Sequence, residues 1–368
     1  MRVVYDPQIF SQQVYGGVSR YFCEIAARIS NAPGVKVSIV APMYVNGYLQ
    51  KMPPGIVAGF RAPRNEQFRR PLRKLDALIT DWMLRATAPD IVHETYFSPR
   101  QTGPNRVCRV LTIYDMIHEK FASHFPHADK TAEYKAIAAK RADHVICISE
   151  STRRDAIEIL QLPAERTSVI HLGCDLMTAG EGRGKDVVLP MKKPFLLYVG
   201  KRGGYKNCLR LMEAYATSPQ LKDGYGLICF GGEPFNGDEL SMIHRLGLNG
   251  SHVMQLGGDD RLLASLYACA SALVYPSLYE GFGIPPLEAM SYGCPVICSN
   301  TSSIPEVVGD AGEYFDPGDV DSMRDAIECV TESKARREEL IAKGRERLNC
   351  FGWDRCASKT LDIYRKLI

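Results

Sequence analysis

Short apolar segments rich in valine and isoleucine alternate along the chain with longer stretches in which apolar residues recur at helical spacing. This alternation is typical of βα units, whose strands form parallel sheets. The strand-like segments fall into two series. The first comprises residues 1–6, 35–41, 90–94, 109–115, 144–149 and 167–172, and the second comprises residues 195–200, 226–232, 252–258, 271–277 and 295–300. The pattern predicts an α/β protein with two doubly wound parallel sheets.

The segment between the two series, residues 177–193, has glycines, charges and a proline but no apolar period, which is typical of a linker. We therefore predict an N-terminal Rossmann-like domain over 1–176, the linker 177–193 and a C-terminal Rossmann-like domain over 194–353. Residues 354–368 again show helical spacing. Because ligands of parallel sheets bind beyond the carboxyl ends of the strands, two such sheets facing each other would form a central cleft.

Composition excludes several classes of protein. The chain has 368 residues, more than one core usually serves, and its net charge of +3 is too small to indicate a nucleic-acid partner. No run of 18 or more apolar residues indicates a transmembrane helix, and the first residues, MRVVYDPQIF, lack the apolar core of a signal peptide, so we expect a cytoplasmic protein. The twelve cysteines are scattered without a CxxC pair, which favours buried reduced thiols over metal ligands or disulfides.

The most informative motif is YPSLYEGFGIPPLE at residues 275–288. Gly281 and Gly283 allow a tight turn, and the two prolines that follow suit the first turn of a helix, whose backbone amides favour an anion such as a diphosphate. Glu280 and Glu288 flank this turn, and phosphates would repel them unless they accepted hydrogen bonds from hydroxyl groups. Hydroxyls on both sides of a diphosphate describe a nucleotide sugar. The alternative is an ordinary loop-to-helix junction with a solvated helix.

The EGFG-x-P-x-x-E pattern resembles the signature of the retaining glycosyltransferases of the GT-B fold, in particular the family-four group (glycosyl transferases group 1). The resemblance covers most of residues 190–365. It implies two Rossmann-like domains facing a central cleft, with the last helix crossing back onto the N-terminal domain. It also implies that Glu280 holds hydroxyls of the transferred sugar and that Glu288 holds the ribose hydroxyls. The sugar and phosphate oxygens would be bound by the backbone amides of Phe282, Gly283 and Ile284.

A second motif is the basic, glycine-rich loop YVGKRGGYKN at residues 198–207, which follows a predicted strand. In the similar family a basic residue, usually arginine, directly follows the first glycine and a lysine comes five positions later. Lys201 and Lys206 take these places, and the resemblance implies that both clamp the donor diphosphate. Lysine at the first place lacks the bidentate fork of arginine, so Arg202 is a candidate substitute. The alternative is a solvated turn.

Two further glycine positions are candidates for donor binding. Gly16 and Gly17 follow the first predicted strand and begin an amphipathic helix, without the full GxGxxG fingerprint. The resemblance implies that this pair lets the backbone approach the donor diphosphate, although a plain tight turn explains it nearly as well. Gly257 lies in the stretch from Gln255 to Gly258, where the resemblance implies that backbone groups bind the nucleobase.

The N-terminal domain should bind the acceptor, since polar and aromatic residues follow the predicted strands in DIVHETYFSP and LTIYDMIHE. His93, Tyr96 and His118 are the candidates. Many relatives have a histidine where this chain has Tyr114, so the resemblance leaves that catalytic position to Tyr114, Asp115 or His118. A histidine at a strand end is also often a purely structural group.

The stretch RAPRNEQFRRPLRKLD at residues 61–76 is basic, with Phe68 and Leu72 interleaved. It could dock on anionic lipid or on a lipid-diphosphate acceptor, which would make the protein peripheral at the inner face of the membrane. The alternative is a solvated basic face.

Together these features imply a retaining hexosyltransferase. It would move a hexose such as mannose or glucose from a nucleoside-diphosphate sugar to a hydroxyl of a glycan or lipid-linked saccharide in polysaccharide or lipopolysaccharide assembly. Lys201, Lys206 and the helix start would stabilise the leaving diphosphate in place of a metal ion, because the sequence has no DxD motif at the donor pocket. No cofactor is expected, and the resemblance implies front-face attack. Two alternatives remain: a sugar-nucleotide epimerase on the same fold, or a nucleotide-sugar-binding partner without turnover.

Overall fold

The computed structural model describes residues 1–63, 72–174, 191 and 193–368. The chain divides into two compact units, which we call unit 1 (residues 1–173 and 352–368) and unit 2 (residues 174–351). These bounds lie close to those predicted for the two domains. The predicted linker, 177–193, lies almost entirely outside the described residues.

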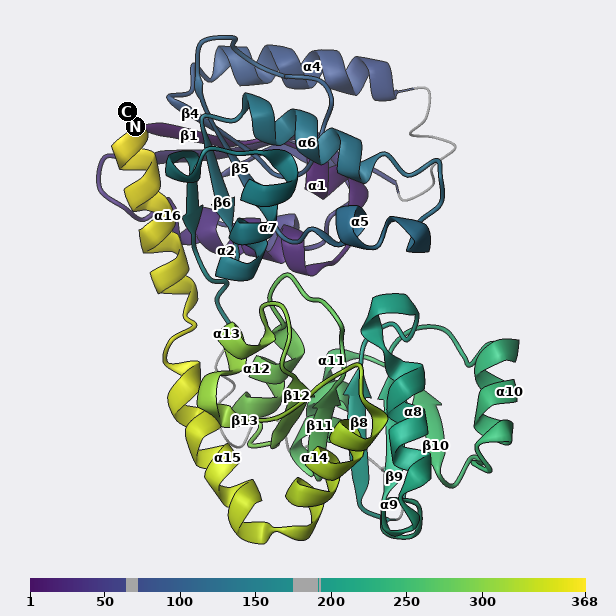
Figure 1. The fold of residues 1–368 in the computed structure, drawn as a ribbon. Coiled ribbons are helices and arrows are strands. Elements are labelled where there is room, and N and C mark those ends of the chain that lie inside the picture. The colour runs from purple at the N-terminus through teal and green to yellow at the C-terminus, as the bar shows by residue number, and fades with distance from the viewer. Residues whose placement is uncertain (64–71, 175–190, 192) are drawn as a thin grey trace. The chain divides into compact units, whose positions relative to one another are not determined.

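Unit 1 is built on a sheet of seven parallel strands in the order β3-β2-β1-β4-β5-β6-β7 (Figure 1). Val3 pairs with Val37 on one side and with Ile91 on the other, so the chain order reverses at β1. The strands are β1 (Arg2–Tyr5), β2 (Lys36–Tyr44), β3 (Val57–Arg61), β4 (Ile91–Glu94), β5 (Cys108–Ile113), β6 (His144–Cys147) and β7 (Thr167–Val169).

All six strands predicted for the first series are present, and β3 was missed. Apart from β3 and β7, these strands are mostly buried, as is usual for parallel strands covered on both faces, and this produces the apolar runs seen in the sequence. Strand β3 lies at the sheet edge, is half-buried to exposed, and includes Gly59, so it has no such run.

The helices of unit 1 include the end of the chain. They are α1 (Gln8–Gln12), α2 (Gly17–Ile29), α4 (Arg73–Ala86), α5 (Ile117–Lys120), α6 (Thr131–Arg141), α7 (Glu150–Leu160) and α16 (Trp353–Leu367). Helix α16 packs on α2, where Arg28 Nε donates a 2.8 Å hydrogen bond to Asp354. The last helix therefore belongs to the N-terminal unit, as the resemblance implies.

Unit 2 contains a second parallel sheet, in the order β10-β9-β8-β11-β12-β13, and here the chain order reverses at β8. Its strands are β8 (Phe195–Val199), β9 (Gly226–Phe230), β10 (Val253–Leu256), β11 (Ala272–Tyr275), β12 (Val296–Ser299) and β13 (Gly312–Phe315). Its helices are α8 (Cys208–Thr217), α9 (Pro219–Gly224), α10 (Gly237–Arg245), α11 (Asp260–Cys269), α12 (Ile284–Ser291), α13 (Ile304–Val308), α14 (Val320–Glu332) and α15 (Lys334–Leu348). Two doubly wound parallel sheets thus confirm the predicted fold class.

The cysteines are less uniformly buried than predicted. Seven of the twelve are buried, two are partly exposed, and Cys269, Cys329 and Cys350 are exposed. The sulfur atoms of Cys208 and Cys229 lie 3.9 Å apart, well beyond the roughly 2.05 Å of a disulfide bond. Burial raises the pKa of Cys294 to about 12, which keeps this thiol protonated.

Candidate functional site

The two predicted donor motifs meet at one edge of the sheet in unit 2. Strands β8 and β11 are neighbours where the strand order reverses, and in open α/β sheets ligands bind outside the carboxyl ends of the strands at such a point. The loop 200–207 follows β8, and the loop 276–283 follows β11. The amide of Leu278 donates a 2.8 Å hydrogen bond to the carbonyl of Tyr205, which joins the two loops.

Within this loop pair, Lys206 contacts Glu280. The lysine belongs to a short 3₁₀ helix, η4 (Gly204–Lys206), and its Nζ donates a 2.7 Å hydrogen bond to Glu280 Oε1. The two side chains are 20% and 9% exposed, so the ion pair is largely shielded from water. Tyr275, fully buried, has its pKa raised by burial and by a charge interaction and a hydrogen bond with Glu280. The predicted phosphate-binding cation and the predicted sugar-binding carboxylate thus lie side by side.

Two serines hold the backbone of the glutamate loop. Ser302 Oγ accepts a 3.1 Å hydrogen bond from the amide of Glu280 and donates to its carbonyl at 2.6 Å. Ser303 Oγ lies 2.9 Å from the carbonyls of both Glu280 and Phe282. Sequence reasoning missed both serines, because an SS pair after a strand has no pattern that reveals such contacts.

The turn after Glu280 has the predicted form. Gly283 precedes α12 with a φ of +110°, a conformation that side chains rarely adopt, and Pro285 and Pro286 occupy the first turn of the helix. The phenyl ring of Phe282 is buried against Phe351, with ring centroids 5.7 Å apart. Gly281, also buried, completes the turn. The N-terminus of α12 therefore begins at the edge that Lys206 and Glu280 occupy.

Glu288, the second predicted glutamate, lies in α12 and is half-buried. Its Oε2 accepts a 3.0 Å hydrogen bond from the hydroxyl of Tyr267 on α11. The ring of Tyr267 stacks on Tyr292 at 5.9 Å between centroids. Tyr267, which sequence reasoning missed, therefore orients the carboxylate that is predicted to hold the ribose.

The two basic candidates beside Lys206 differ in their surroundings. Lys201 is exposed, and its carbonyl accepts a hydrogen bond from the hydroxyl of Tyr198. The guanidinium of Arg202 is buried and binds Glu239 at 2.7 and 3.2 Å. It also donates to the carbonyls of Gly231 and Glu233. The prediction that Arg202 could take the place of Lys201 at the diphosphate is therefore corrected. Its N–H groups already bind the carboxylate of Glu239 and the backbone carbonyls of Gly231 and Glu233.

Gly257 is exposed directly after β10, at the carboxyl edge of the same sheet. Gly16 and Gly17, in unit 1, stand at the start of α2. Gly16 has an extended backbone that any residue adopts, but an added Cβ would lie 2.4 Å from Gln13 Oε1. That oxygen is the end of a flexible side chain that can move aside, so packing alone does not require glycine at position 16. The donor roles of all three glycines stay predictions.

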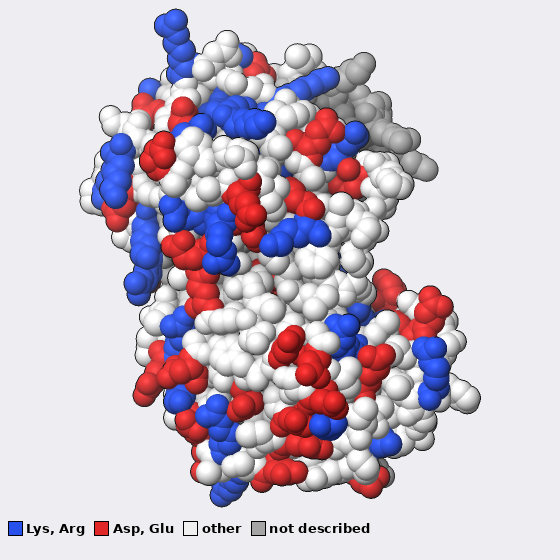
Figure 2. All heavy atoms as spheres, in the orientation of Figure 1, with Lys and Arg blue, Asp and Glu red and all other residues white. Residues whose placement is uncertain are grey.

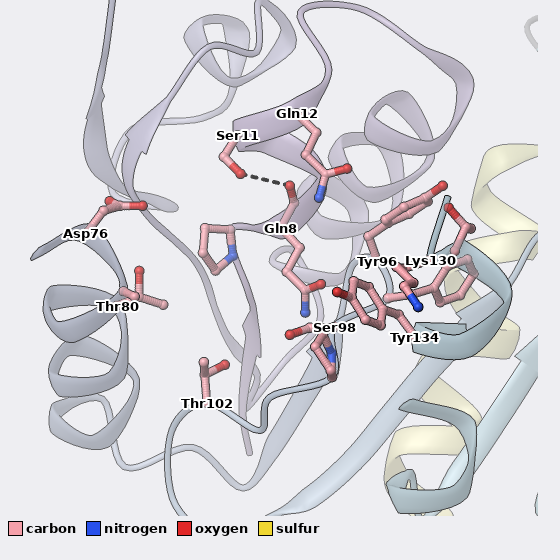
Figure 3. Close-up of a pocket in the computed structure, with 15 residues that line it drawn as sticks. Gln8, Ser11, Gln12, Asp76, Thr80, Tyr96, Ser98, Thr102, Lys130 and Tyr134 are labelled. Carbon is pink, nitrogen blue, oxygen red and sulfur yellow. Dashed lines mark hydrogen bonds between the residues drawn. The ribbon is translucent and has the colours of Figure 1, made fainter. Parts of the chain in front are cut away.

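In unit 1 a pocket of about 450 Å³ lies where the strand order reverses, beyond the ends of β1 and β4 (Figure 3). Hydroxyl, amide and aromatic side chains dominate its lining, among them Gln8, Ser11, Thr80, Tyr96 and Tyr134. Its size falls within the roughly 300–1,000 Å³ of small-molecule sites, and such a lining suits the hydroxyl groups and the apolar faces of a sugar. Tyr96 was a predicted acceptor residue; the other four were not.

A buried carboxylate holds side chains at this pocket in place. Asp6, directly after β1, accepts hydrogen bonds from the amide and hydroxyl of Thr95 at 2.8 and 2.6 Å. It also accepts a 2.6 Å hydrogen bond from Gln8 Nε2, which leaves the amide oxygen and the second N–H of Gln8 for other partners. Burial and the charge of Glu94 raise the pKa of Asp6 to about 6. The sequence shows only a strand that ends in YD, which is too common to reveal this role.

His93 is corrected from an acceptor candidate to a structural group. Its ring is fully buried, with Nδ1 2.5 Å from Tyr364 Oη on α16 and Nε2 2.9 Å from Thr112 Oγ1. Burial lowers the pKa of His93 to about 3, so the ring is neutral at physiological pH. Because both nitrogens are engaged inside unit 1, His93 fastens α16 to the sheet and has no face for an acceptor.

The other predicted residues of unit 1 lie after β5. Tyr114 is buried with its ring against Tyr21, and burial raises its pKa, so the phenol stays neutral. Asp115 is partly exposed and lies 3.7 Å from the buried ammonium of Lys135. The ring of His118 stacks on Phe125 at 4.0 Å. Asp115 therefore offers a charged group at this edge, whereas Tyr114 serves the core.

Among the described residues, none of the helices is both long and apolar enough to span a membrane. Over the same residues, His, Cys, Asp and Glu form no group of three that could hold a metal ion. Residues 64–71 of the predicted basic stretch, which include Phe68, lie outside the described part of the chain.

This chain is similar to known proteins in both sequence and fold. The sequence profile of the Glycosyl transferases group 1 family matches residues 184–347, and that of Glycosyltransferase Family 4 matches residues 15–177. The O-antigen chain mannosyltransferase B of Escherichia coli is 31% identical over 296 residues, which cover 78% of this chain and 77% of the relative. An alpha-maltose-1-phosphate synthase of Mycobacterium tuberculosis is 27% identical, and the match covers the whole of both chains.

Solved structures agree on the fold. A sucrose-phosphate synthase from Thermosynechococcus elongatus has a TM-score of 0.74 at 21% identity, covering 100% of this chain and 98% of that one. Anabaena HepE in complex with UDP and glucose has a TM-score of 0.73 at 18% identity, with both chains fully covered. The two profiles span both units and the E. coli relative shares most of the chain, so this protein belongs to the group 1 (family 4) glycosyltransferases of the GT-B fold and is a glycosyltransferase.

Proposed function

We propose that this glycosyltransferase moves a hexose, with retention of configuration, from a nucleoside-diphosphate sugar to a hydroxyl of a glycan or lipid-linked saccharide in surface-polysaccharide assembly. The observation that carries the proposal is the contact between Lys206 and Glu280 where the strand order of unit 2 reverses. Mannose is the hexose we favour, because the E. coli relative is named a mannosyltransferase. The diphosphate donor is supported by the HepE structures with UDP and with UDP-glucose.

In the proposed reaction, the bond from the anomeric carbon to the diphosphate oxygen breaks while the acceptor oxygen bonds to that carbon on the same face. The acceptor proton passes to an oxygen of the leaving diphosphate. Negative charge builds on the phosphate oxygens, and Lys206, Lys201 and the N-terminus of α12 stabilise it. Glu280 accepts hydrogen bonds from hydroxyls of the transferred sugar. Glu288, held by Tyr267, accepts those of the ribose.

These roles need no cofactor and no divalent metal ion, because side-chain ammonium groups and helix amides balance the negative charge that a metal would otherwise balance.

The acceptor binds the pocket in unit 1, with its sugar against Tyr96 and its hydroxyls at Gln8 and Ser11. Asp115 is the residue we favour for contact with the reacting groups. We place the protein in the cytoplasm, where nucleotide sugars would reach it.

The test is binding and turnover of a panel of UDP-, GDP-, ADP- and dTDP-sugars by the purified protein in the presence of EDTA, with product analysis by NMR. Saturable binding of one donor and transfer to a saccharide, with the anomeric configuration of the donor kept, is the expected result. An epimerised nucleotide sugar would favour an epimerase instead. Binding without any turnover would favour a partner subunit, and an absolute need for added Mg²⁺ or Mn²⁺ would contradict the charge assignment.

A further inference from the structure

Tyr15, in the loop between α1 and α2 of unit 1, is a large aromatic side chain that is 60% exposed. A single exposed aromatic residue is ordinary on a protein surface and indicates nothing by itself. Tyr15 differs because three separate features hold its ring in one place. The first is a neighbouring ring: Tyr15 makes an edge contact with Tyr48, with centroids 5.2 Å apart and 78° between the ring planes.

The second feature is the backbone of the loop that carries the ring. The carbonyl of Val14 accepts a 2.8 Å hydrogen bond from the amide of Gly47. Asn46 is fully buried, and its Nδ2 donates a 2.8 Å hydrogen bond to the carbonyl of Gln13. The Oδ1 of Asn46 accepts a 3.0 Å hydrogen bond from the amide of Tyr48. One buried side-chain amide therefore connects the two loops that carry the two rings.

The third feature is Gly47, against which the tip of the Tyr15 ring lies. A Cβ added at position 47 would lie well inside van der Waals contact with Cε1, Cζ and Oη of Tyr15. The backbone itself does not require glycine here, since the φ of −79° and ψ of −27° are a helical conformation that any residue adopts. An alanine at position 47 would therefore displace the ring of Tyr15 from its place.

The ring lies close to the acceptor pocket. Gln12, at the end of α1, lines that pocket (Figure 3), and Tyr15 follows three positions later. Three residues span at most about 11 Å, so the Cα atoms of Gln12 and Tyr15 lie within that distance. Aromatic side chains also line the pocket itself, at Tyr96, Phe97 and Tyr134. A saccharide that extends from the pocket past the end of α1 would meet the ring of Tyr15.

We propose that Tyr15 is the stacking platform of an outer acceptor subsite, which binds the sugar next to the one in the pocket; this inference rests on the proposed function. The C–H groups on one face of a sugar pack on an aromatic ring, and a sugar hydroxyl can bond to the phenol. A ring that is already fixed loses little entropy on binding. The acceptor is thus an oligosaccharide of at least two sugar units.

The surface charge agrees with an uncharged ligand. On the face that Figure 2 shows, the described basic and acidic side chains of unit 1 are interspersed. Attraction of a strongly charged ligand from solution is favoured by a broad field of one sign, whereas a neutral saccharide needs none. The contacts with Tyr15 would therefore come from ring stacking and hydrogen bonds.

The direct test is the affinity of the full chain for mannose saccharides of different length, measured by isothermal titration calorimetry without any nucleotide sugar. Mannose is the probe because it is the hexose we favour. The wild type should bind α-linked mannotriose about tenfold more tightly than methyl α-mannoside, which corresponds to one stacked ring. Tyr15→Ala should lose this advantage of the longer saccharide, and Tyr15→Phe, which keeps the ring, should retain most of it.

Two further variants separate the position of the ring from its presence. Gly47→Ala keeps Tyr15 but displaces its ring, so it should lose the advantage as Tyr15→Ala does. Phe60→Ala is the matched control, because Phe60 lies on β3 of the same unit, is 61% exposed and should not affect either affinity. Equal wild-type affinity for one and three sugars would overturn the proposal. An advantage that survives Tyr15→Ala, or that Phe60→Ala also removes, would overturn it too.

These outcomes are separable from those of the proposed function. In transfer assays, Tyr15→Ala should raise KM for mannotriose with a much smaller change in kcat, because the ring contacts a sugar away from the reacting hydroxyl. Transfer to methyl α-mannoside without any gain for longer acceptors would contradict the outer subsite and leave the proposed function standing. Mannotriose binding that depends on Tyr15, in a protein that transfers no hexose, would contradict the proposed function and leave the subsite standing.

Discussion

The side-chain ammonium of Lys206 donates a 2.7 Å hydrogen bond to the carboxylate of Glu280, 74 positions further along the chain. The fold brings these two residues together because each follows one of two neighbouring parallel strands, β8 and β11. Without a donor each charge balances the other. In the function we propose, a bound nucleotide sugar offers phosphate oxygens to the ammonium and hydroxyls to the carboxylate, so the pair would act on the two ends of the bond that breaks.

Replacing Lys206 with alanine should lower kcat/KM by about 10²–10³-fold, the usual effect of removing one group that stabilises developing charge. The same change should weaken binding of the nucleoside diphosphate, measured by isothermal titration calorimetry. Lys334→Ala removes an exposed lysine from the same unit and serves as the matched control. Unchanged diphosphate affinity in Lys206→Ala would remove this residue from the donor site.

The variant Glu280→Gln should distinguish contacts with the transferred sugar from contacts with the diphosphate. The amide keeps the size of the side chain but accepts hydrogen bonds more weakly than a carboxylate, so transfer should fall by about tenfold or more. Affinity for the nucleoside diphosphate without its sugar should change much less. Glu338→Gln, at an exposed position on α15, is the control. An equal loss of affinity for diphosphate and for nucleotide sugar would contradict contact between Glu280 and the sugar.

Gly283→Ala should destabilise unit 2 and disturb the helix start. A side chain at a φ of +110° costs about 1–2 kcal/mol, which corresponds to a fall in Tm of roughly 2–4 °C per kcal/mol for a domain of this size. Gly237→Ala is the matched control, since Gly237 begins α10, has no positive φ, and has open space around an added Cβ. Differential scanning calorimetry measures both. Equal Tm values for the two variants would show that the turn is unstrained.

The burial of His93 predicts a pH dependence of stability. The pKa of this ring is about 3 in the folded protein and about 6.5 in the unfolded chain, so below pH 6.5 the unfolded state binds more protons. The stability from the neutral ring is complete above pH 6.5 and is lost as the pH falls toward 3. The raised pKa of Asp6, about 6, acts oppositely between about pH 4 and 6, where the folded state binds more protons.

His93→Gln isolates the histidine from Asp6. The variant should be less stable than the wild type at pH 7, and this difference should shrink as the pH falls from 6.5 to 4, because only the wild type loses the histidine contribution. Chemical denaturation at several pH values measures the difference. A difference that stays constant over this range would show that the pKa of His93 is not lowered.

Much of the fold could be predicted because buried parallel strands produce continuous apolar runs, as in GLICF of β9. The meeting of Lys206 and Glu280 could also be predicted, since both residues follow such runs. Asp6, Tyr267 and Ser302 could not, because each is an ordinary polar residue whose role depends on a partner far along the chain. His93 illustrates the converse: its position at the end of a strand suggested a ligand contact, but Tyr364 of α16 contacts its ring.

The exposed apolar face of α4, which carries Leu75, Leu78, Ile79 and Trp82, escaped prediction for a different reason. Apolar residues at helical spacing predict a face that packs on a core, and sequence alone does not reveal which of two such faces does so. In α4 the face with Leu84 packs on the sheet, and the face with Leu78 and Trp82 remains exposed. The exposed face could therefore be assigned only from the structure.

The most direct test of the central claim is a double-mutant cycle on kcat/KM with Lys206→Ala, Glu280→Gln and the double variant, using the donor that the panel identifies. Two residues that contact each other and act on one bound donor are coupled, so their effects should not add. The account predicts a double variant scarcely worse than the poorer single variant. Losses that multiply, as for two independent sites, would contradict a shared donor site built on Lys206 and Glu280.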